Sequence, residues 1–237
     1  MINKELNLRE LKYKFLKTGI VTINNWLDKE YANNLQNHLD TMPKDWWSVS
    51  AKPALDQDLH ISRWLEDCPD CVDYIAKSDA IARDAFTKNI FSYSFRRTQN
   101  DHVEGCTCLE CKFRQDVLSE EVVEFLHYIT EFKITKINEL FASWYTDKDF
   151  LSPHADGING ILGFVYNLSK NWRPEYGGNL HFMDKENNNI IQKINVPNEG
   201  RPLWPPFNCR NFGGGSPFFR VPYFKGFSTT CLAPGNI

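Results

Sequence analysis

Residues 144–184, WYTDKDFLSPHADGINGILGFVYNLSKNWRPEYGGNLHFMD, decide how the rest of the chain is interpreted. At the centre of this stretch, His154 and Asp156 are separated by one alanine. Side chains alternate along an extended chain, so this imidazole and this carboxylate point to the same side. They form two-thirds of the 2-His-1-carboxylate triad, which holds non-haem Fe(II) and leaves coordination positions open. A His-x-Asp pair is common by itself, so its weight depends on the residues around it.

Those residues read as strands and a turn. Residues 139–145 form the strand that leads to the pair, and residues 161–168 are an apolar run with strand character. The NLSKNW segment at 167–172 closes this run as a turn, and GGNL at 177–180 begins the next strand. A Pro-Phe-Asn segment follows at 206–208.

The order of these motifs resembles the 2-oxoglutarate/Fe(II) oxygenase superfamily, in its prolyl-4-hydroxylase-like branch. The resemblance runs from about residue 139 to residue 233. It implies an α+β fold in which a double-stranded β-helix, or jelly roll, is supported by N-terminal helices. It also implies Fe(II) as cofactor and 2-oxoglutarate as small-molecule cosubstrate. The expected reaction is hydroxylation of a C–H bond in a protein side chain or a small molecule.

The resemblance also assigns roles to individual residues. His154 and Asp156 are expected to be the iron ligands and the catalytic centre. Tyr145 falls where the family often has an aromatic residue beside 2-oxoglutarate. Asn167 and Leu180 fall at positions that line the cosubstrate pocket in relatives.

The chain departs from the family near its C-terminus. Relatives carry a segment His-x-Val-x-Pro-Val-x-x-Gly-x-Arg, whose His is the third iron ligand and whose Arg pairs with the far carboxylate of 2-oxoglutarate. With Pro222 and Gly226 in register, Phe218 occupies the His position and Ser228 the Arg position. Phenylalanine has no lone pair to donate, and serine cannot neutralise a carboxylate.

Three interpretations of this departure remain open. The iron could have two protein ligands, or a histidine of the N-terminal half (His60, His102 or His127) could complete the triad. Alternatively, the domain is a catalytically degenerate binding or scaffolding module. His181 does not fill the gap, because strand alternation turns it away from the side of Leu180.

Arg220 bears on all three interpretations. It shares a face with Phe218, so we expect it to point into the roll. There it could hold the 2-oxoglutarate carboxylate, or it could pair with Asp156 in place of a metal, because a buried carboxylate without a cation is costly.

A cysteine-containing segment precedes the motif. Thiolates separated by one or two residues suit a structural Zn²⁺, which takes four tetrahedral N or S ligands. Free thiols in a reducing cell are the alternative. The candidate zinc ligands are Cys68, Cys71, Cys106, Cys108 and Cys111, with His102 nearby.

The chain of 237 residues, with a formal charge of -3, is predicted to form a single domain over residues 1–237. Residues 67–115 are expected to be an elaboration outside a jelly-roll core at about 139–233. The sequence contains no basic block, so it does not suggest nucleic acid as a partner. No apolar run reaches the roughly 18 residues of a membrane span, and the N-terminal residues lack the apolar region of a secretory signal. A cytoplasmic protein is therefore expected.

Helices are expected before the motif and strands after it. Helical periodicity predicts helices at 3–17, 28–42, 67–86 and 118–132, the second with Asp28 as N-cap. Strands are expected at 19–23 and 90–97, and Trp46 and Trp47 are expected in the core.

Overall fold

The computed structural model describes residues 1–43, 46–54, 57–64, 69–88, 90–98, 105–145, 149–152, 161–169, 180–183, 190–194, 202–204 and 224–234. Within these residues, helices flank an antiparallel sheet of nine strands, and a further pair of strands forms a second sheet. The expected mixture of helices and strands is confirmed, and the pairing throughout is antiparallel.

The helices of the described residues are α1 (Leu8–Thr18), α2 (Lys29–Thr41), α3 (Pro69–Thr87), α4 (Leu109–Asp116) and α5 (Glu120–Thr130). The strands before the His-x-Asp pair are β1 (Val21–Thr22), β2 (Trp47–Ala54), β3 (Gln57–Trp64), β4 (Tyr93–Thr98), β5 (Ile134–Tyr145) and β6 (Phe150–Leu151). The strands after it are β7 (Leu162–Asn167), β8 (Leu180–Met183), β9 (Ile190–Ile194), β10 (Pro202–Trp204) and β11 (Phe224–Pro234).

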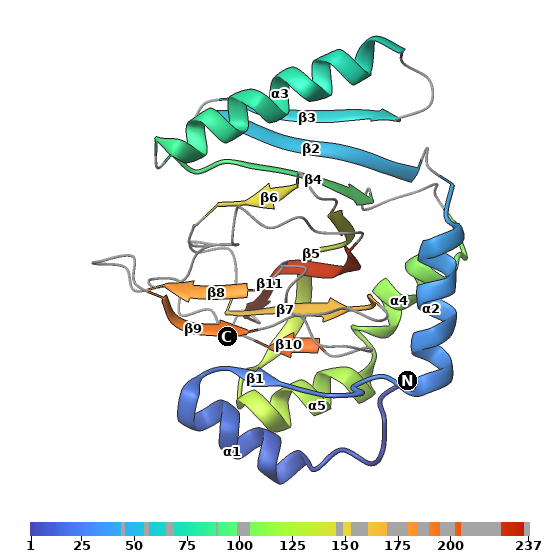
Figure 1. Cartoon of the computed structure of the whole chain (residues 1–237). Coiled ribbons are helices and arrows are strands. Elements are labelled where there is room, and N and C mark those ends of the chain that lie inside the picture. Colours follow the sequence, from blue (N-terminus) through green and yellow to red (C-terminus); the bar gives the residue numbers. More distant parts are fainter. Residues whose placement is uncertain are drawn as a thin grey trace.

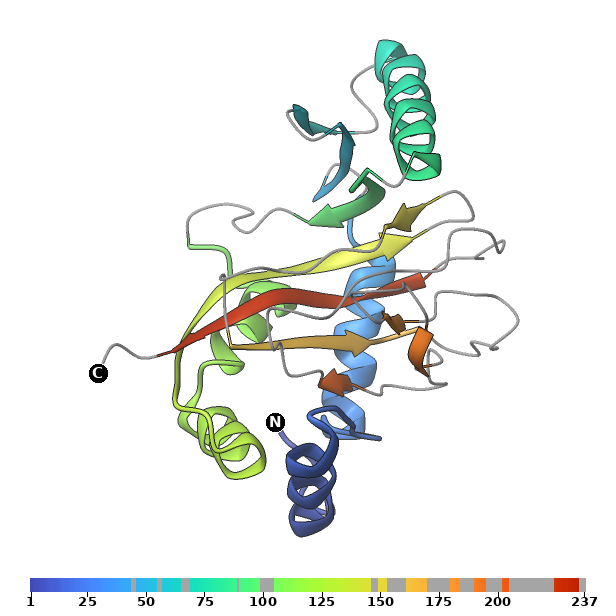
Figure 2. The same cartoon turned by 90° about the vertical axis from the view of Figure 1, so that its left-hand side faces the viewer.

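The order of strands brings distant parts of the chain together. It runs β1-β10-β7-β11-β5-β4-β2-β3, with β6 paired to β4, while β8 and β9 form the two-stranded sheet. The last strand, β11, therefore lies between β5 and β7 in the middle of the large sheet (Figure 2). The N-terminal strand β1 lies at one end of this order, and the β2–β3 hairpin, covered by α3, lies at the other (Figure 1).

Side-chain caps set the beginnings of the first two helices. Asp28 accepts hydrogen bonds from the N–H groups of Glu30 and Tyr31, which confirms it as the N-cap of α2. The prediction for the first helix was wrong at its start, because α1 begins only after Asn7, whose side chain accepts from the N–H of Glu10. The residues before it are held elsewhere, since Ile2 forms a β-bridge with Leu27.

The main core lies between the helices and one face of the large sheet. Leu35 and Leu39 of α2 are fully buried, as their spacing predicted, and Trp47 is also buried. Trp26 has its ring centroid 5.8 Å from that of Tyr166 on β7. Burying each side chain of this size contributes about 1.5–3 kcal/mol. Further members of this cluster are Leu11, Phe15, Val122, Phe125, Leu126, Ile129, Leu140, Ala142 and Phe164.

Several elements differ from the sequence-based prediction. The β2–β3 hairpin and α4 were not predicted, because their segments are short, polar and without clear periodicity. Strand β5 begins at Ile134, five residues earlier than expected. Ile81, an apolar residue of α3, is 52% exposed and does not enter the core.

No helix in the described ranges combines the length and apolar character needed to cross a membrane.

Candidate functional site

The central strands carry several of the predicted site residues on one face. In the β11–β5 and β11–β7 ladders, Gly226 is paired with Ser143 and with Asn167. Phe224 is paired with Tyr145, two positions further along. Directly opposed residues lie on the same face of a sheet, and so do residues two apart on one strand. Tyr145 and Asn167 therefore share a face.

We call this face the inner face, and it lies opposite the helices. Its residues on β5 and β7 alternate with Leu140, Ala142, Phe164 and Tyr166, which belong to the core packed against the helices. The register places Ser228, at the position of the family's arginine, in the row of Phe141 and Val165. On the three central strands β5, β7 and β11, the inner face includes Phe141, Ser143, Tyr145, Val165, Asn167, Gly226 and Ser228.

Tyr145 belongs to an aromatic stack on the inner face. Its ring lies 5.0 Å from that of Phe95 at 13°, and Phe95 is stacked on Phe141 at 6.2 Å and 18°. Burial, and secondarily the charge of Asp149, raises the pKa of Tyr145 above its usual range. The phenol therefore keeps its proton at neutral pH, and its hydroxyl can donate a hydrogen bond.

Asn167 and Leu180 are placed by different strands. Asn167, at the end of β7, is 2% exposed, and its side-chain oxygen accepts a 3.0 Å hydrogen bond from the N–H of Ser169. Leu180 and Val165 both pack against a small cluster of Ile20 and Phe182. Leu180 of β8 and the inner-face residue Val165 of β7 therefore contact the same small cluster.

His181 lies on the other side of β8 from Leu180 and Phe182 by strand alternation. It is half-buried, and its pKa is lowered by burial and, to a lesser degree, by the charge of Lys193. The imidazole is therefore neutral at pH 7.

Arg97 is an inner-face residue that the sequence reasoning missed. It is paired with Ser143, and its guanidinium carbon lies 3.8 Å from the ring centroid of Phe141. The alternation of Phe91, Tyr93 and Phe95 could have identified it, since the next residue of that series is Arg97. The neighbouring Arg96 lies on the opposite side and forms a 2.7 Å ion pair with Asp149.

The His-x-Asp pair lies outside the described residues, as do Phe218, Arg220, His60's side chain and His102. The chain that leads to the pair is held beside the start of β4: the N–H of Ser152 donates to the carbonyl of Ser92 at 3.0 Å, and the Ser152 hydroxyl accepts from the N–H of Ser92 at 2.8 Å. The chain returns at β7, which carries Asn167. His127, described on α5, is exposed and contacts the carbonyl of Phe132.

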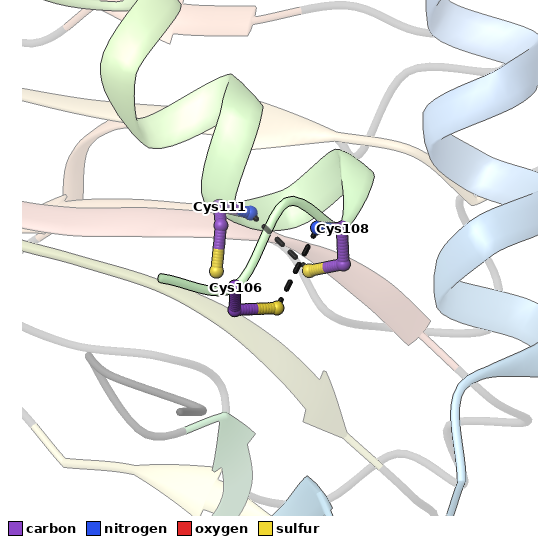
Figure 3. Close-up of side chains that lie close together, drawn as sticks. All are labelled: Cys106, Cys108 and Cys111. Atoms are coloured by element: carbon purple, nitrogen blue, oxygen red, sulfur yellow. Dashed lines mark hydrogen bonds between the residues drawn. The ribbon is translucent and has the colours of Figure 1, made fainter. Parts of the chain in front are cut away.

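Three of the candidate zinc ligands converge at the start of α4. The sulfur atoms of Cys106, Cys108 and Cys111 all lie within 4.8 Å of one another (Figure 3). Burial raises the pKa of the Cys108 thiol, and burial together with the neighbouring thiols raises that of Cys111 to about 12. Cys68 lies outside the described residues, as does the side chain of Cys71, and the helix that carries Cys71, α3, packs against β2 and β4.

A cavity of about 840 Å³ lies on the helix side of the sheet. It is lined by the N-terminal residues, the start of α2, and Tyr166 and Leu168. Asn167 lies between these two residues and faces the other way. This cavity is therefore distinct from the inner face.

The fold of the chain is similar to that of solved 2-oxoglutarate/Fe(II) oxygenases, prolyl hydroxylases among them. An oxidoreductase of the 2OG-Fe(II) oxygenase family from Burkholderia pseudomallei shares 9% identity at a TM-score of 0.59, over 99% of this chain and 95% of that one. A Trichoplax adhaerens prolyl hydroxylase, solved with a peptide fragment of the oxygen degradation domain of hypoxia inducible factor, shares 15% identity at a TM-score of 0.55, over 96% and 93%. A Pseudomonas putida prolyl-4-hydroxylase shares 11% identity at a TM-score of 0.50, over 99% and 98%.

These likenesses confirm, at the level of the fold, the resemblance indicated by the sequence motifs. No protein-family model and no curated protein matches the chain.

Proposed function

We propose that this protein is an Fe(II)- and 2-oxoglutarate-dependent oxygenase that hydroxylates a C–H bond. The observation that carries the proposal is the shared inner face in a fold similar to these oxygenases: Gly226 of β11 is paired with both Ser143 and Asn167, and Tyr145 lies two positions from Ser143 on the same face. The likeness of the fold alone does not assign a reaction, because one fold hosts many functions. The chemistry of the inner face supplies the additional support.

The inner face suits a polar, anionic ligand. Ser143 and Asn167 are each 2% exposed, so polar groups are buried on a face otherwise lined by aromatic and aliphatic side chains. A dicarboxylate supplies acceptors for hydroxyl, amide and guanidinium donors. We propose that Tyr145, Asn167 and Leu180 line the 2-oxoglutarate pocket of a jelly roll, in which β8 and β9 contribute to the second sheet.

The metal would be held by His154 and Asp156, an imidazole and a carboxylate that suit Fe(II). When bound, iron supplies the O2 chemistry and 2-oxoglutarate the two electrons that hydroxylation requires, with release of succinate and CO2. The protein itself positions the cosubstrate and excludes water. We propose that the substrate is either a protein side chain or a small molecule. The Trichoplax enzyme was solved with a peptide.

Two arginines are candidates for the far carboxylate of 2-oxoglutarate, since Ser228 cannot neutralise it. Arg220 was identified from the sequence by its face and its proximity to Phe218. Arg97 is supported by the structure, because its guanidinium covers Phe141, which is paired with Ser228. A planar guanidinium can bind a carboxylate through two parallel hydrogen bonds.

The proposal is tested by succinate release with Fe(II) and 2-oxoglutarate, because uncoupled turnover needs no known substrate. We expect slow turnover and iron binding in the parent protein, with both lost in His154→Ala and in Asp156→Ala. The control is His38→Ala, the same substitution at a histidine away from the pair. A parent protein that neither binds iron nor releases succinate would contradict the oxygenase proposal and favour the degenerate binding module, whose basis is the loss of the histidine at Phe218.

A further inference from the structure

Three cysteines lie close together at the start of α4. Cys106 and Cys108 are one residue apart, and Cys111 follows three residues later in the first turn of the helix. All three side chains are half-buried, and their sulfur atoms lie within 4.8 Å of one another (Figure 3). Sulfurs bound to one tetrahedral metal at about 2.3 Å are separated by roughly 3.8 Å, so small side-chain rotations would close the difference.

The backbone around the sulfurs is arranged to support negative charge. The N–H of Cys108 donates to the sulfur of Cys106, and the N–H of Cys111 donates to the sulfur of Cys108, each at 3.5 Å. Cys108 is also the N-cap of α4, so its sulfur lies at the positive end of the helix dipole. These N–H donors oppose the effect of burial, which on balance raises the pKa of Cys108 and Cys111, so a bound metal would displace the thiol protons.

We propose that Cys106, Cys108 and Cys111 bind a structural Zn²⁺ ion. Soft thiolate ligands select zinc over the hard cations, and structural zinc sites commonly contain three or four cysteines. This site is independent of the proposed iron site, which uses no sulfur.

A disulfide explains the cluster less well than a metal does. It would join two sulfurs and leave the third without a role, although all three sulfurs lie within 4.8 Å of one another. It would also not account for the chain of N–H···S hydrogen bonds through all three cysteines.

The position of the site indicates what the metal stabilises. Helix α4 is tied to the sheet by Glu110 and Arg114, and to α2 by the hydroxyl of Tyr31, which donates to Asp116 at 2.7 Å. The cysteines lie at the beginning of the helix. A metal there would fix the first turn of α4, which carries Glu110, the residue that accepts a hydrogen bond from Thr98 of β4.

The experiment measures zinc by elemental analysis in protein purified without chelator, in the background His154→Ala/Asp156→Ala, which removes the proposed iron ligands. We expect about one zinc per chain, falling at least tenfold in Cys108→Ser and Cys111→Ser. Cys231→Ser, on β11, is the matched control and should retain the metal. Removal of zinc from the parent protein should lower its melting temperature, and zinc addition should restore it.

A second measurement does not depend on the folding of variants. Cobalt(II) titrated into the metal-free parent protein should give the intense visible absorption of a tetrahedral site and the near-ultraviolet band of thiolate ligation. Protein that carries no zinc and gives no such bands would overturn the proposal. So would zinc content that survives in both cysteine variants, or a disulfide that forms within the cluster in air while added zinc has no effect on its rate.

Discussion

At the scale of single residues, Arg97 is the side chain whose position matters most for the proposed cosubstrate. It lies against Phe141, and the ring shields one side of the guanidinium from water. Phe141 is in turn paired with Ser228, where relatives carry their arginine. We therefore propose that a cation from β4 serves the position where the family resemblance leads us to expect one on β11.

We predict that Arg97→Gln weakens 2-oxoglutarate binding by roughly 10- to 100-fold, the value of a hydrogen bond to a charged group. Arg97→Lys retains the charge but not the paired N–H donors of the guanidinium, so it should lose less affinity for 2-oxoglutarate than Arg97→Gln does. Calorimetric titration with a redox-inert divalent metal measures the affinity without turnover. Unchanged affinity in Arg97→Gln, together with a large loss in Arg220→Gln, would assign the carboxylate to Arg220 instead.

At the scale of elements, a buried polar network joins α4 to two strands of the sheet. The Thr98 hydroxyl of β4 donates to Glu110 at 2.5 Å and accepts from the N–H of Ala142 on β5 at 3.0 Å. Arg114 donates to Glu110 at 2.6 Å and to the carbonyl of Leu140. Thr98 and Glu110 are fully buried, so each hydrogen bond replaces one that water would otherwise make.

We predict that Thr98→Val lowers the free energy of unfolding by about 1–3 kcal/mol, because the N–H of Ala142 and the carboxylate of Glu110 lose a buried partner. Valine matches threonine in shape, so packing changes little. The same exchange at Thr41, whose exposed hydroxyl donates within α2, should change the value by less than about 0.5 kcal/mol. Urea denaturation measures both; equal effects at the two positions would show that the network contributes nothing specific.

At the scale of the whole molecule, the C-terminal strand completes the centre of the sheet. Strand β11 pairs with β5 along most of its length and with β7 on its other side (Figure 2). Phe218 and Ser228, the two departures from the family pattern, precede and lie within this strand. Ser228 therefore lies on a strand whose two neighbours, β5 and β7, come from other parts of the sequence.

We predict that Phe218→His combined with Ser228→Arg binds Fe(II) more tightly and releases more succinate than the parent protein, because an imidazole donor and a cosubstrate cation return. Phe218→Leu with Ser228→Gln, which changes size without adding a ligand or a charge, is the control. Iron affinity and succinate are measured for both. A folded double variant no better than its control would mean that the pocket has changed beyond these two positions.

The sequence by itself determined the class of fold and part of the inner face. The His-x-Asp pair and the strand-turn-strand pattern after it indicated a fold similar to these oxygenases. Alternation within a single strand separated Leu180 from His181. The cap at Asp28 and the buried stripe of α2 were correct because capping and helical periodicity act within one turn.

Only the tertiary structure decided which strands are neighbours. The pairing of Gly226 with both Ser143 and Asn167 joins residues far apart in the chain, and no local periodicity encodes it. The same is true of Arg97 on Phe141 and of Thr98 between Glu110 and Ala142. Short polar elements such as α4 and the β2–β3 hairpin form because neighbouring elements supply partners for their backbone and side chains, so their sequences alone carry little signal.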